Sequence, residues 1–310
     1  MLNPELQGEI YPQIDEIDGD VASITLKFCI TTKDENRNYN YEVTEFFRIN
    51  QVSEKVTYVY SYDRFMNQIF EPEYGISSGR NIYLGINEDK SLQTMCNSTG
   101  TVTAFVVNGN LWSYHPNRDK FNKVFSFDEE TSDGFRENNR NYGIKILDVD
   151  KNGDIYFVVY GYMNRGSHEG NTGIAAYMYN FASNTITELA FIPTDENYLV
   201  TKEELDKAAY INDRKILYFY RNRSIYYLNY ETKECMLLDS NVVPDTCMTS
   251  GNNVLVYQTE NVDNLINIID LKDGVKRTIQ CETNEKIRVL GFIDNNIVYG
   301  LAPDCLLYTS

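Results

Sequence analysis

The segment that decides the fold is IKILDVDKNGDIYFVVYG, residues 144–161, in which two runs of β-branched and aromatic residues flank the polar turn Lys151-Asn152-Gly153. This pattern predicts a β-hairpin, because asparagine and glycine tolerate the left-handed backbone angles of tight turns. Three further copies follow: KAAYINDRKILYFYR from Lys207, TCMTSGNNVLVYQTE from Thr246 and IRVLGFIDNNIVYGLA from Ile287. The chain therefore contains an internal repeat built on a hairpin.

A second recurring unit, a strand that ends in a polar turn, follows each of the first three copies. It reads YMYNFASNTITEL near Asn180, YYLNYETKECMLL near Asn229 and IIDLKDGVKRTI near Asp270. The two units together make four-stranded modules, and LWSYHPNRDKFNKVF from Leu111 matches the outer hairpin of an earlier one. Repeats of about 40 to 50 residues with several strands are typical of β-propeller blades. The copy at Ile287 has no such partner, which predicts a partial, truncated propeller.

The region before these modules also has strand patterns. Three long runs, Val21–Thr31, Tyr41–Ile49 and Val56–Tyr62, predict a meander, and nothing before Val21 resembles the start of a packed domain. Shorter runs then follow, which predict the strands Asn81–Ile86, Val102–Asn108, Leu111–Tyr114 and Val124–Phe127. We expect residues 1–79 to form either a separate subdomain or earlier blades, and residues 80–304 to form incomplete propeller blades.

One helix is predicted in this otherwise all-β chain. Thr201 and Glu204 have the spacing of a capping box, which predicts a helix from there to about Ala209. The fold class is therefore all-β, with four-stranded blades and one short helix.

The last six residues, Cys305–Ser310 (CLLYTS), resemble the translated end of a transposon adaptor used in sequencing libraries. On that resemblance, residues 305–310 are a non-native tail and the native part of the chain stops near Asp304. Met1 can equally be an internal methionine, so an export signal or an anchor can lie upstream.

Composition and charge exclude several functions. The chain has 310 residues, 42% of them hydrophobic, and a formal net charge of −17. This acidity argues against nucleic acid or an anionic lipid surface as a partner, since those bind clustered lysine and arginine. No apolar stretch approaches the roughly 20 residues of a membrane-spanning helix. We expect no membrane insertion within this segment, and its first five residues lack the features of a signal peptide.

Five cysteines remain when Cys305 is set aside, and they are scattered singly: Cys29, Cys96, Cys235, Cys247 and Cys281. An odd, widely spaced set argues against a disulfide framework and against a structural zinc site. We expect buried free thiols. A catalytic cysteine has no support, because neither His115 nor His168 lies in a cysteine-hydrolase signature.

Residues 148–154 match the first half of a calcium-binding loop. Asp148, Asp150, Asn152 and Asp154 place oxygen ligands at alternate positions, with a glycine at the turn. The second half of the motif fails, because Val159 stands where a bidentate glutamate is required. A hairpin turn is the simpler interpretation, and a calcium site at these four residues is the alternative; no other cofactor is expected.

The best candidate for a ligand site is the loop Gly161–Gly173, an insertion that the other modules lack. Asn164, Arg165, His168 and Glu169 place an amide, a cation, a titratable imidazole and a carboxylate in one glycine-punctuated loop. Binding groups are often found on loops held by a rigid scaffold. The competing interpretation is a long surface hairpin whose polar side chains are solvated. The loop has no second histidine, so it is not a zinc-protease motif.

Aromatic residues are abundant, with 25 tyrosines and 15 phenylalanines. Tyrosines at alternate strand positions can form a carbohydrate- or peptide-binding platform. Most of them lie in predicted strands, where packing between sheets is the expected role. The sequence contains no nucleophile elbow, phosphate loop or dinucleotide fingerprint.

The repeats at residues 80–303 resemble bacterial β-propeller proteins with degenerate blades, although the Gly-His and Trp-Asp signals of one common propeller repeat are absent. The aromatic strands, the acidity and the phrase GYMNRGSHEG from Gly161 are also similar to uncharacterised surface or membrane-anchored proteins of gut Firmicutes. The resemblance implies a bacterial, extracytoplasmic or envelope-anchored protein.

The favoured function is non-catalytic binding or scaffolding, with a protein or carbohydrate ligand that meets the loop 161–173. One alternative is a propeller-class glycoside hydrolase or lyase, which needs two convergent carboxylates. A second alternative is the sensor domain of a membrane-anchored regulator.

Overall fold

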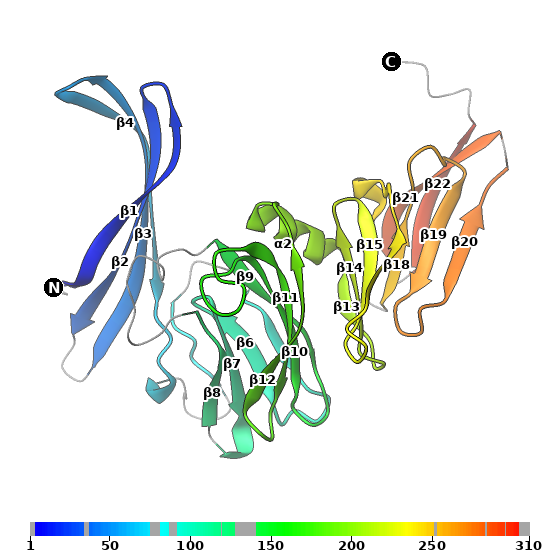
Figure 1. The fold of residues 1–310 in the computed structure, drawn as a ribbon, viewed down its shortest axis with the longest axis horizontal. Helices are drawn as coiled ribbons and strands as arrows, with labels where there is room; N and C mark the ends of the chain where they lie inside the picture. The colour runs from blue at the N-terminus through cyan, green and yellow to red at the C-terminus, as the bar shows by residue number, and fades with distance from the viewer. Residues whose placement is uncertain are drawn as a thin grey trace. The chain divides into compact units, whose positions relative to one another are not determined.

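The structure is a computed structural model, which describes residues 4–33, 37–74, 81–86, 92–118, 120–127, 141–250, 253–282, 284–294 and 296–303 (Figure 1). The chain separates into two compact units. The first comprises Met1–Gly153 with Asn164–Gly170, and the second comprises Asp154–Met163 with Asn171–Ser310. The adaptor-like residues 305–310 lie outside the described residues.

The first four strands form one antiparallel sheet in sequence order, drawn in blue in Figure 1. Its strands are β1 (Glu5–Asp18), β2 (Val21–Lys33), β3 (Asn38–Ser53) and β4 (Val56–Gln68). The predicted meander is confirmed. The sequence pattern gave no strand before Val21, whereas the structure has the exposed strand β1 paired with β2 through two register shifts. The strand escaped detection because it is exposed and acidic, so its apolar residues do not form the dense run of a buried strand.

Four further four-stranded antiparallel sheets follow, each with its strands in consecutive order. Consecutive four-stranded antiparallel sheets are typical of propeller blades, and the predicted all-β fold class is confirmed. The strands of the first two sheets are β5 (Thr94–Cys96), β6 (Thr103–Val107), β7 (Asn110–His115), β8 (Lys120–Phe125), β9 (Tyr142–Val149), β10 (Ile155–Tyr162), β11 (Thr172–Asn180) and β12 (Thr185–Pro193).

The strands of the next two sheets are β13 (Ala209–Ile211), β14 (Ile216–Arg221), β15 (Ser224–Asn229), β16 (Cys235–Asp239), β17 (Met248–Thr249), β18 (Val254–Tyr257), β19 (Leu265–Asp270) and β20 (Lys276–Gln280). A two-stranded sheet of β21 (Glu285–Ile293) and β22 (Asn296–Pro303) comes last, as the unpartnered copy at Ile287 predicts. The strand expected at Asn81–Ile86 is absent: these residues contain one isolated bridge residue, Ile82. Short 3-10 helices lie at Pro72–Tyr74, Pro116–Arg118 and Pro244–Thr246.

The first hairpin of each of the four sheets from β5 to β20 is closed by the same turn. Its first residue is Asn97, Asp150, Asn212 or Ser250, and the backbone oxygen of that residue accepts from the amide three positions later at 2.9–3.0 Å. The side-chain oxygen of the same residue also accepts a backbone N–H of the turn. The closing residue always has a positive φ, as in Gly100, Gly153, Lys215 and Asn253. This shared turn explains why four dissimilar sequences form the same type of hairpin. In the fourth copy, Gly251 and Asn252 lie outside the described residues.

A second shared turn closes three outer hairpins. Asn180, Asn229 and Asp270 each end the third strand of a sheet, and their side-chain oxygens accept backbone N–H groups of the turn at 2.9–3.2 Å. The residue four positions later has a positive φ in all three cases, at Asn184, Lys233 and Gly274. The two predicted repeat units therefore correspond to two hairpin types.

The helix α2 (Tyr198–Lys207) begins earlier than the sequence predicts. Its N-cap is Asn197, whose side chain accepts from the Leu199 amide at 2.9 Å, so the expected capping box at Thr201 is wrong. Thr201 is buried inside the helix and Glu204 instead accepts the Asn222 amide at 2.7 Å. Asparagine is as good an N-cap residue as threonine, and the buried position of Thr201 places it inside the helix.

In the second unit, neighbouring sheets pack face to face, and β18 contributes side chains to two hydrophobic cores. Leu255 and Tyr257 face a cluster that includes Tyr218 and Tyr220 of β14. Val256, which points to the other side of the strand, packs with Ile287 of β21. Burial on both faces explains why the strand is apolar at every position.

Side-chain amides join neighbouring sheets in both units. Gln258 donates to the Ile287 carbonyl at 2.8 Å and accepts the Val289 amide at 3.1 Å. In the first unit, Gln93 makes the same pair of bonds to β9, donating to the Ile144 carbonyl at 2.9 Å and accepting from Ile146 at 3.1 Å. Each glutamine thus continues the strand ladder from one sheet to the next.

The five cysteines of the described chain are free thiols, as predicted, but only Cys247 is buried. Cys96 and Cys235 are exposed, so the expectation of burial is wrong for these two. Both lie on terminal strands of their sheets, where side chains of a short strand remain open to solvent. No helix of the described residues is long and apolar enough to cross a membrane.

Candidate functional site

The predicted ligand loop joins β10 to β11 and is held by structural contacts. The Met163 amide donates to the Asn171 carbonyl at 2.9 Å, which closes the base of the loop. Asn164 is buried, and the Arg165 Nε donates to the Phe127 carbonyl at 3.0 Å. His168 is half-buried and Glu169 is exposed.

The loop thus places Asn164 and Arg165 toward the protein, whereas Glu169 faces solvent. Two cavities in the described part of the second unit, of about 430 and 420 Å³, are lined by other residues. A ligand role for Asn164, Arg165, His168 and Glu169 stays a prediction.

The predicted calcium residues lie at the β9–β10 turn, where the hairpin interpretation is confirmed. Asp150 accepts the Asn152 amide at 2.8 Å. Asp154 accepts the Phe181 amide at 2.8 Å and the Asn180 side-chain amide at 3.3 Å. These two carboxylates therefore cap turns. Asp148 lies within β9. Across the described residues, no three His, Cys, Asp or Glu side chains are grouped to hold a metal ion.

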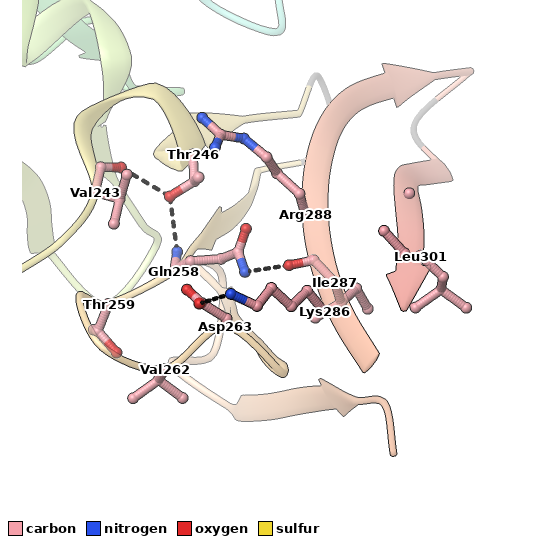
Figure 2. A pocket seen from close by; sticks show the side chains of 12 residues that line it. Val243, Thr246, Gln258, Thr259, Val262, Asp263, Lys286, Ile287, Arg288 and Leu301 are labelled. Atoms are coloured by element: carbon pink, nitrogen blue, oxygen red, sulfur yellow. Dashed lines mark hydrogen bonds and ion pairs between the residues drawn. The ribbon is translucent and has the colours of Figure 1, made fainter. Parts of the chain in front are cut away.

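A cavity of about 430 Å³ lies instead between the sheet β17–β20 and the hairpin β21–β22 (Figure 2). Such a volume is within the range of small-molecule sites. Its wall is made by the segment before β17, the segment after β18 and both strands of the hairpin. The lining residues are Val243, Thr246, Gln258, Thr259, Val262, Asp263, Lys286, Ile287, Arg288, Gly300, Leu301 and Ala302.

Two cations of β21 give the cavity its charge. Lys286 pairs with Asp263 through an Nζ–Oδ2 distance of 3.0 Å, and both side chains remain partly exposed. Arg288 is exposed and has no ion-pair partner among the described residues. Figure 2 shows its side chain extending to the side of the cavity where Thr246 lies. The cavity therefore has a net positive lining in a chain whose net charge is −17.

A hydrogen-bonded wall holds the inner side of the cavity. Thr246 Oγ1 donates to the Val243 carbonyl at 2.8 Å and accepts the Gln258 amide at 2.9 Å, as the dashed lines in Figure 2 show. The Gln258 side chain is in turn bonded to β21. Because these groups already bind one another, the wall is preorganised.

The remaining lining is apolar or small. Leu301 and Val262 are exposed at 54% and 37%, so a ligand that covered them would remove apolar surface from water. Gly300 leaves room, since a β-carbon at its position would meet only Leu290 Cδ1 at 3.6 Å. The geometry suits a small molecule with an apolar body and an anionic group.

A second cavity of about 420 Å³ opens between the same sheet and hairpin and is lined by Val254, Ile268, Asp270, Arg277, Ile279, Asn296 and Ile297. Like the first, it contains a single carboxylate. Among the described residues, the buried polar side chains belong to Ser, Thr, Asn and Gln and none to Asp or Glu.

The sequence-based search missed Asp263, Lys286 and Arg288. Lys286 and Arg288 are two positions apart in a strand, which places both side chains on one face. Two cations on one face of a strand in a strongly acidic chain are a signal that could have identified them. Asp263 lies in a separate connection, and only the folded chain brings it to Lys286.

No protein-family model matches the chain, and no curated protein matches its sequence. Solved structures resemble it: Porphyromonas gingivalis dipeptidyl peptidase 4 is 15% identical, with 84% of this chain and 46% of that chain covered and a TM-score of 0.40. For the tricorn protease, the identity is 12%, the coverage 90% and 32%, and the TM-score 0.34.

The extracellular domain of a one component system from B. thetaiotaomicron is 13% identical, with 95% and 39% covered and a TM-score of 0.33. The chain spans less than half the length of each of these three proteins. With TM-scores below 0.5, the resemblances carry no functional argument.

Proposed function

We propose that the chain is a non-catalytic binding domain of an extracytoplasmic bacterial protein, and that the cavity between β17–β20 and β21–β22 binds a small organic anion. The observation that carries the proposal is Arg288, an arginine without an ion-pair partner in the described chain, beside the Lys286–Asp263 pair in a cavity of about 430 Å³. Guanidinium groups bind carboxylate and phosphate in a two-pronged geometry. The apolar lining supplies the contact for the rest of the molecule.

The extracytoplasmic and envelope-anchored location is part of this proposal and rests on the sequence resemblance. The two described cavities do not favour the carbohydrate-active enzyme alternative, because each is lined by one carboxylate whereas glycoside hydrolysis uses two. The predicted loop at Asn164–Glu169 remains a second surface for a protein or carbohydrate partner.

The test is a thermal-shift titration of the full chain with benzoate, succinate and phenyl phosphate. Binding at about ten times Kd raises the free energy of unfolding by about 1.4 kcal/mol, which is a measurable rise in Tm. We expect at least one of these anions to raise Tm. The substitution Arg288→Gln should abolish that rise.

Arg277→Gln is the matched control, since Arg277 is an exposed arginine that lines the second cavity. It removes the same charge and should leave the rise in Tm unchanged. An absence of any shift for all three anions contradicts the proposal, as does an equal loss of the shift in both variants.

A further inference from the structure

The cavity beside Arg288 also contains a group that a plain anion does not use, the carboxylate of Asp263. Its Oδ2 atom pairs with Lys286 Nζ at 3.0 Å, as the dashed line in Figure 2 shows, and the Asp263 side chain is 65% exposed. In the described part of the chain, its Oδ1 atom has neither a hydrogen bond nor an ion pair. Because an ionised carboxylate has about four lone-pair sites, Asp263 can still accept from a ligand.

The carboxylate that lines the second cavity differs in this respect. Asp270 caps a turn, since its Oδ1 accepts the Lys272 amide at 3.0 Å. Asp263 is joined to the fold by its backbone instead, because its carbonyl accepts the Ile287 amide at 2.8 Å. The Asp263 side chain therefore does not hold a turn in place, and its oxygen is available to a ligand.

The charges of the lining favour a ligand that carries both signs. Lys286 is already paired by Asp263, whereas Arg288 has no ion-pair partner in the described chain. A ligand carboxylate can bind Arg288. A second carboxylate would be repelled by Asp263, whereas an ammonium group would be attracted to it. The lining thus opposes a dicarboxylate and suits a zwitterion.

The spacing of these groups fits an α-amino acid. Lys286 and Arg288 are two positions apart in β21, so their side chains leave one face of the strand about 7 Å apart. Asp263 is held at the end of Lys286. An α-amino acid separates its ammonium and carboxylate groups by a single carbon atom. A hydrogen bond of about 2.9 Å at each end lets it bridge two protein groups at this spacing.

We infer that the cavity binds an α-amino acid with an apolar side chain, an inference that rests on the proposed function of this cavity. The α-carboxylate binds Arg288, and the α-ammonium donates to Asp263 Oδ1. The apolar side chain covers Val262 and Leu301, which are exposed at 37% and 54%. Gly300 lies opposite Arg288 in the hairpin and leaves room for the ligand.

The test is a calorimetric titration of the full chain with two matched pairs of ligands that differ only in the α-ammonium group. The pairs are L-phenylalanine with 3-phenylpropionate and L-leucine with 4-methylpentanoate. In at least one pair, the amino acid should bind at least about tenfold more tightly, which is the contribution of a hydrogen bond to a charged group. This comparison uses the unmodified chain and does not depend on how a variant folds.

Asp263→Asn should remove the difference within the pair and leave binding of the amine-free acid in place. The matched control is Asp245→Asn, since Asp245 is an exposed aspartate next to Thr246 that does not line the cavity. It removes the same charge and should preserve the difference.

The outcomes separate this inference from the proposed function. If both amine-free acids bind as tightly as their amino acids, or if only benzoate, succinate or phenyl phosphate binds, the cavity is an anion site and the amino-acid inference is wrong. A difference that survives Asp263→Asn, or that both variants remove, also overturns it. If none of these compounds binds, the proposed function itself fails.

Discussion

Two strands of this protein, β14 and β4, share tyrosines at alternate positions but have opposite environments. β14 contains Tyr218 and Tyr220 at alternate positions, and these are exposed at 6% and 2%. β4 contains Tyr58 and Tyr60, which are exposed at 57% and 61%. Both strands form antiparallel ladders, β14 with β15 in unbroken register and β4 with β3 through two register shifts. Local sequence therefore specifies the strand, and the presence or absence of a neighbouring sheet decides whether its rings form a core.

The two strands are also stabilised by different interactions. The sheet of β14 packs against the sheet of β18 through a shared core, whereas β4 is held by its ladder with β3. Substitutions that remove packing should therefore act strongly on β14 and hardly at all on β4.

The largest effect expected is from alkaline pH on the packed sheets. Burial raises the pKa of Tyr220 from 10.0 to about 12 and that of the Cys247 thiol from 9.0 to about 12. Burial also raises the pKa of Tyr160, Tyr177 and Tyr257. The unfolded chain loses these protons first, so the free energy of unfolding falls as pH rises from about 9 toward 12.

Urea unfolding at a series of pH values measures this dependence. The buried tyrosine hydroxyls should ionise only as the chain unfolds, so the absorbance of tyrosinate should rise over the same pH range as unfolding. A stability that stays constant up to pH 12 contradicts the assignment of these hydroxyls to the core.

The next effect is the cost of removing one ring from each strand. Phe219 of β14 is 1% exposed and stacks on Tyr226 at 5.4 Å between ring centroids. Phe219→Ala should lower the free energy of unfolding by about 3–5 kcal/mol. Tyr58→Ala should change it by no more than about 0.5 kcal/mol. Chemical denaturation of both variants measures the two changes in the free energy of unfolding. Equal decreases would contradict the view that the exposure of Tyr58 makes its ring unimportant for stability.

The smallest effect concerns the shared outer turn. Gly274 has φ +78°, and a β-carbon there would lie 2.7 Å from Tyr218 Oη, so Gly274→Ala should cost about 1–2 kcal/mol. Lys233 occupies the same turn position with φ 61°. Lys233→Gly relieves the left-handed strain at an exposed site and should stabilise the chain by about 0.5 kcal/mol.

Thermal unfolding compares these two variants. Gly274→Ala should lower Tm and Lys233→Gly should raise it, although the two residues occupy equivalent positions of two hairpins. The same sign in both would mean that the turns are not equivalent.

The candidate site was less predictable than the fold, and particular residues show why. The composition of the loop 161–173 predicts a ligand site, yet its Arg165 donates to a backbone carbonyl within the protein. Arg288 belongs to a strand copy that looked purely structural. Its role depends on the cavity beside it, and a cavity is a property of two packed elements.

Errors in the fold have the same origin. β1 was missed because edge strands need not be apolar, and the cap at Asn197 was missed because Thr201 fits the same pattern. In both cases the sequence was compatible with two local structures, and packing chose between them.

The local sequence specified the repeated strands and hairpins of residues 144–303, because side-chain alternation and the left-handed turn residues act over a few neighbouring positions. Only the tertiary structure decided which tyrosines are buried and that Asp263 meets Lys286 beside Arg288. These properties depend on contacts between segments far apart in the chain, which no local pattern encodes.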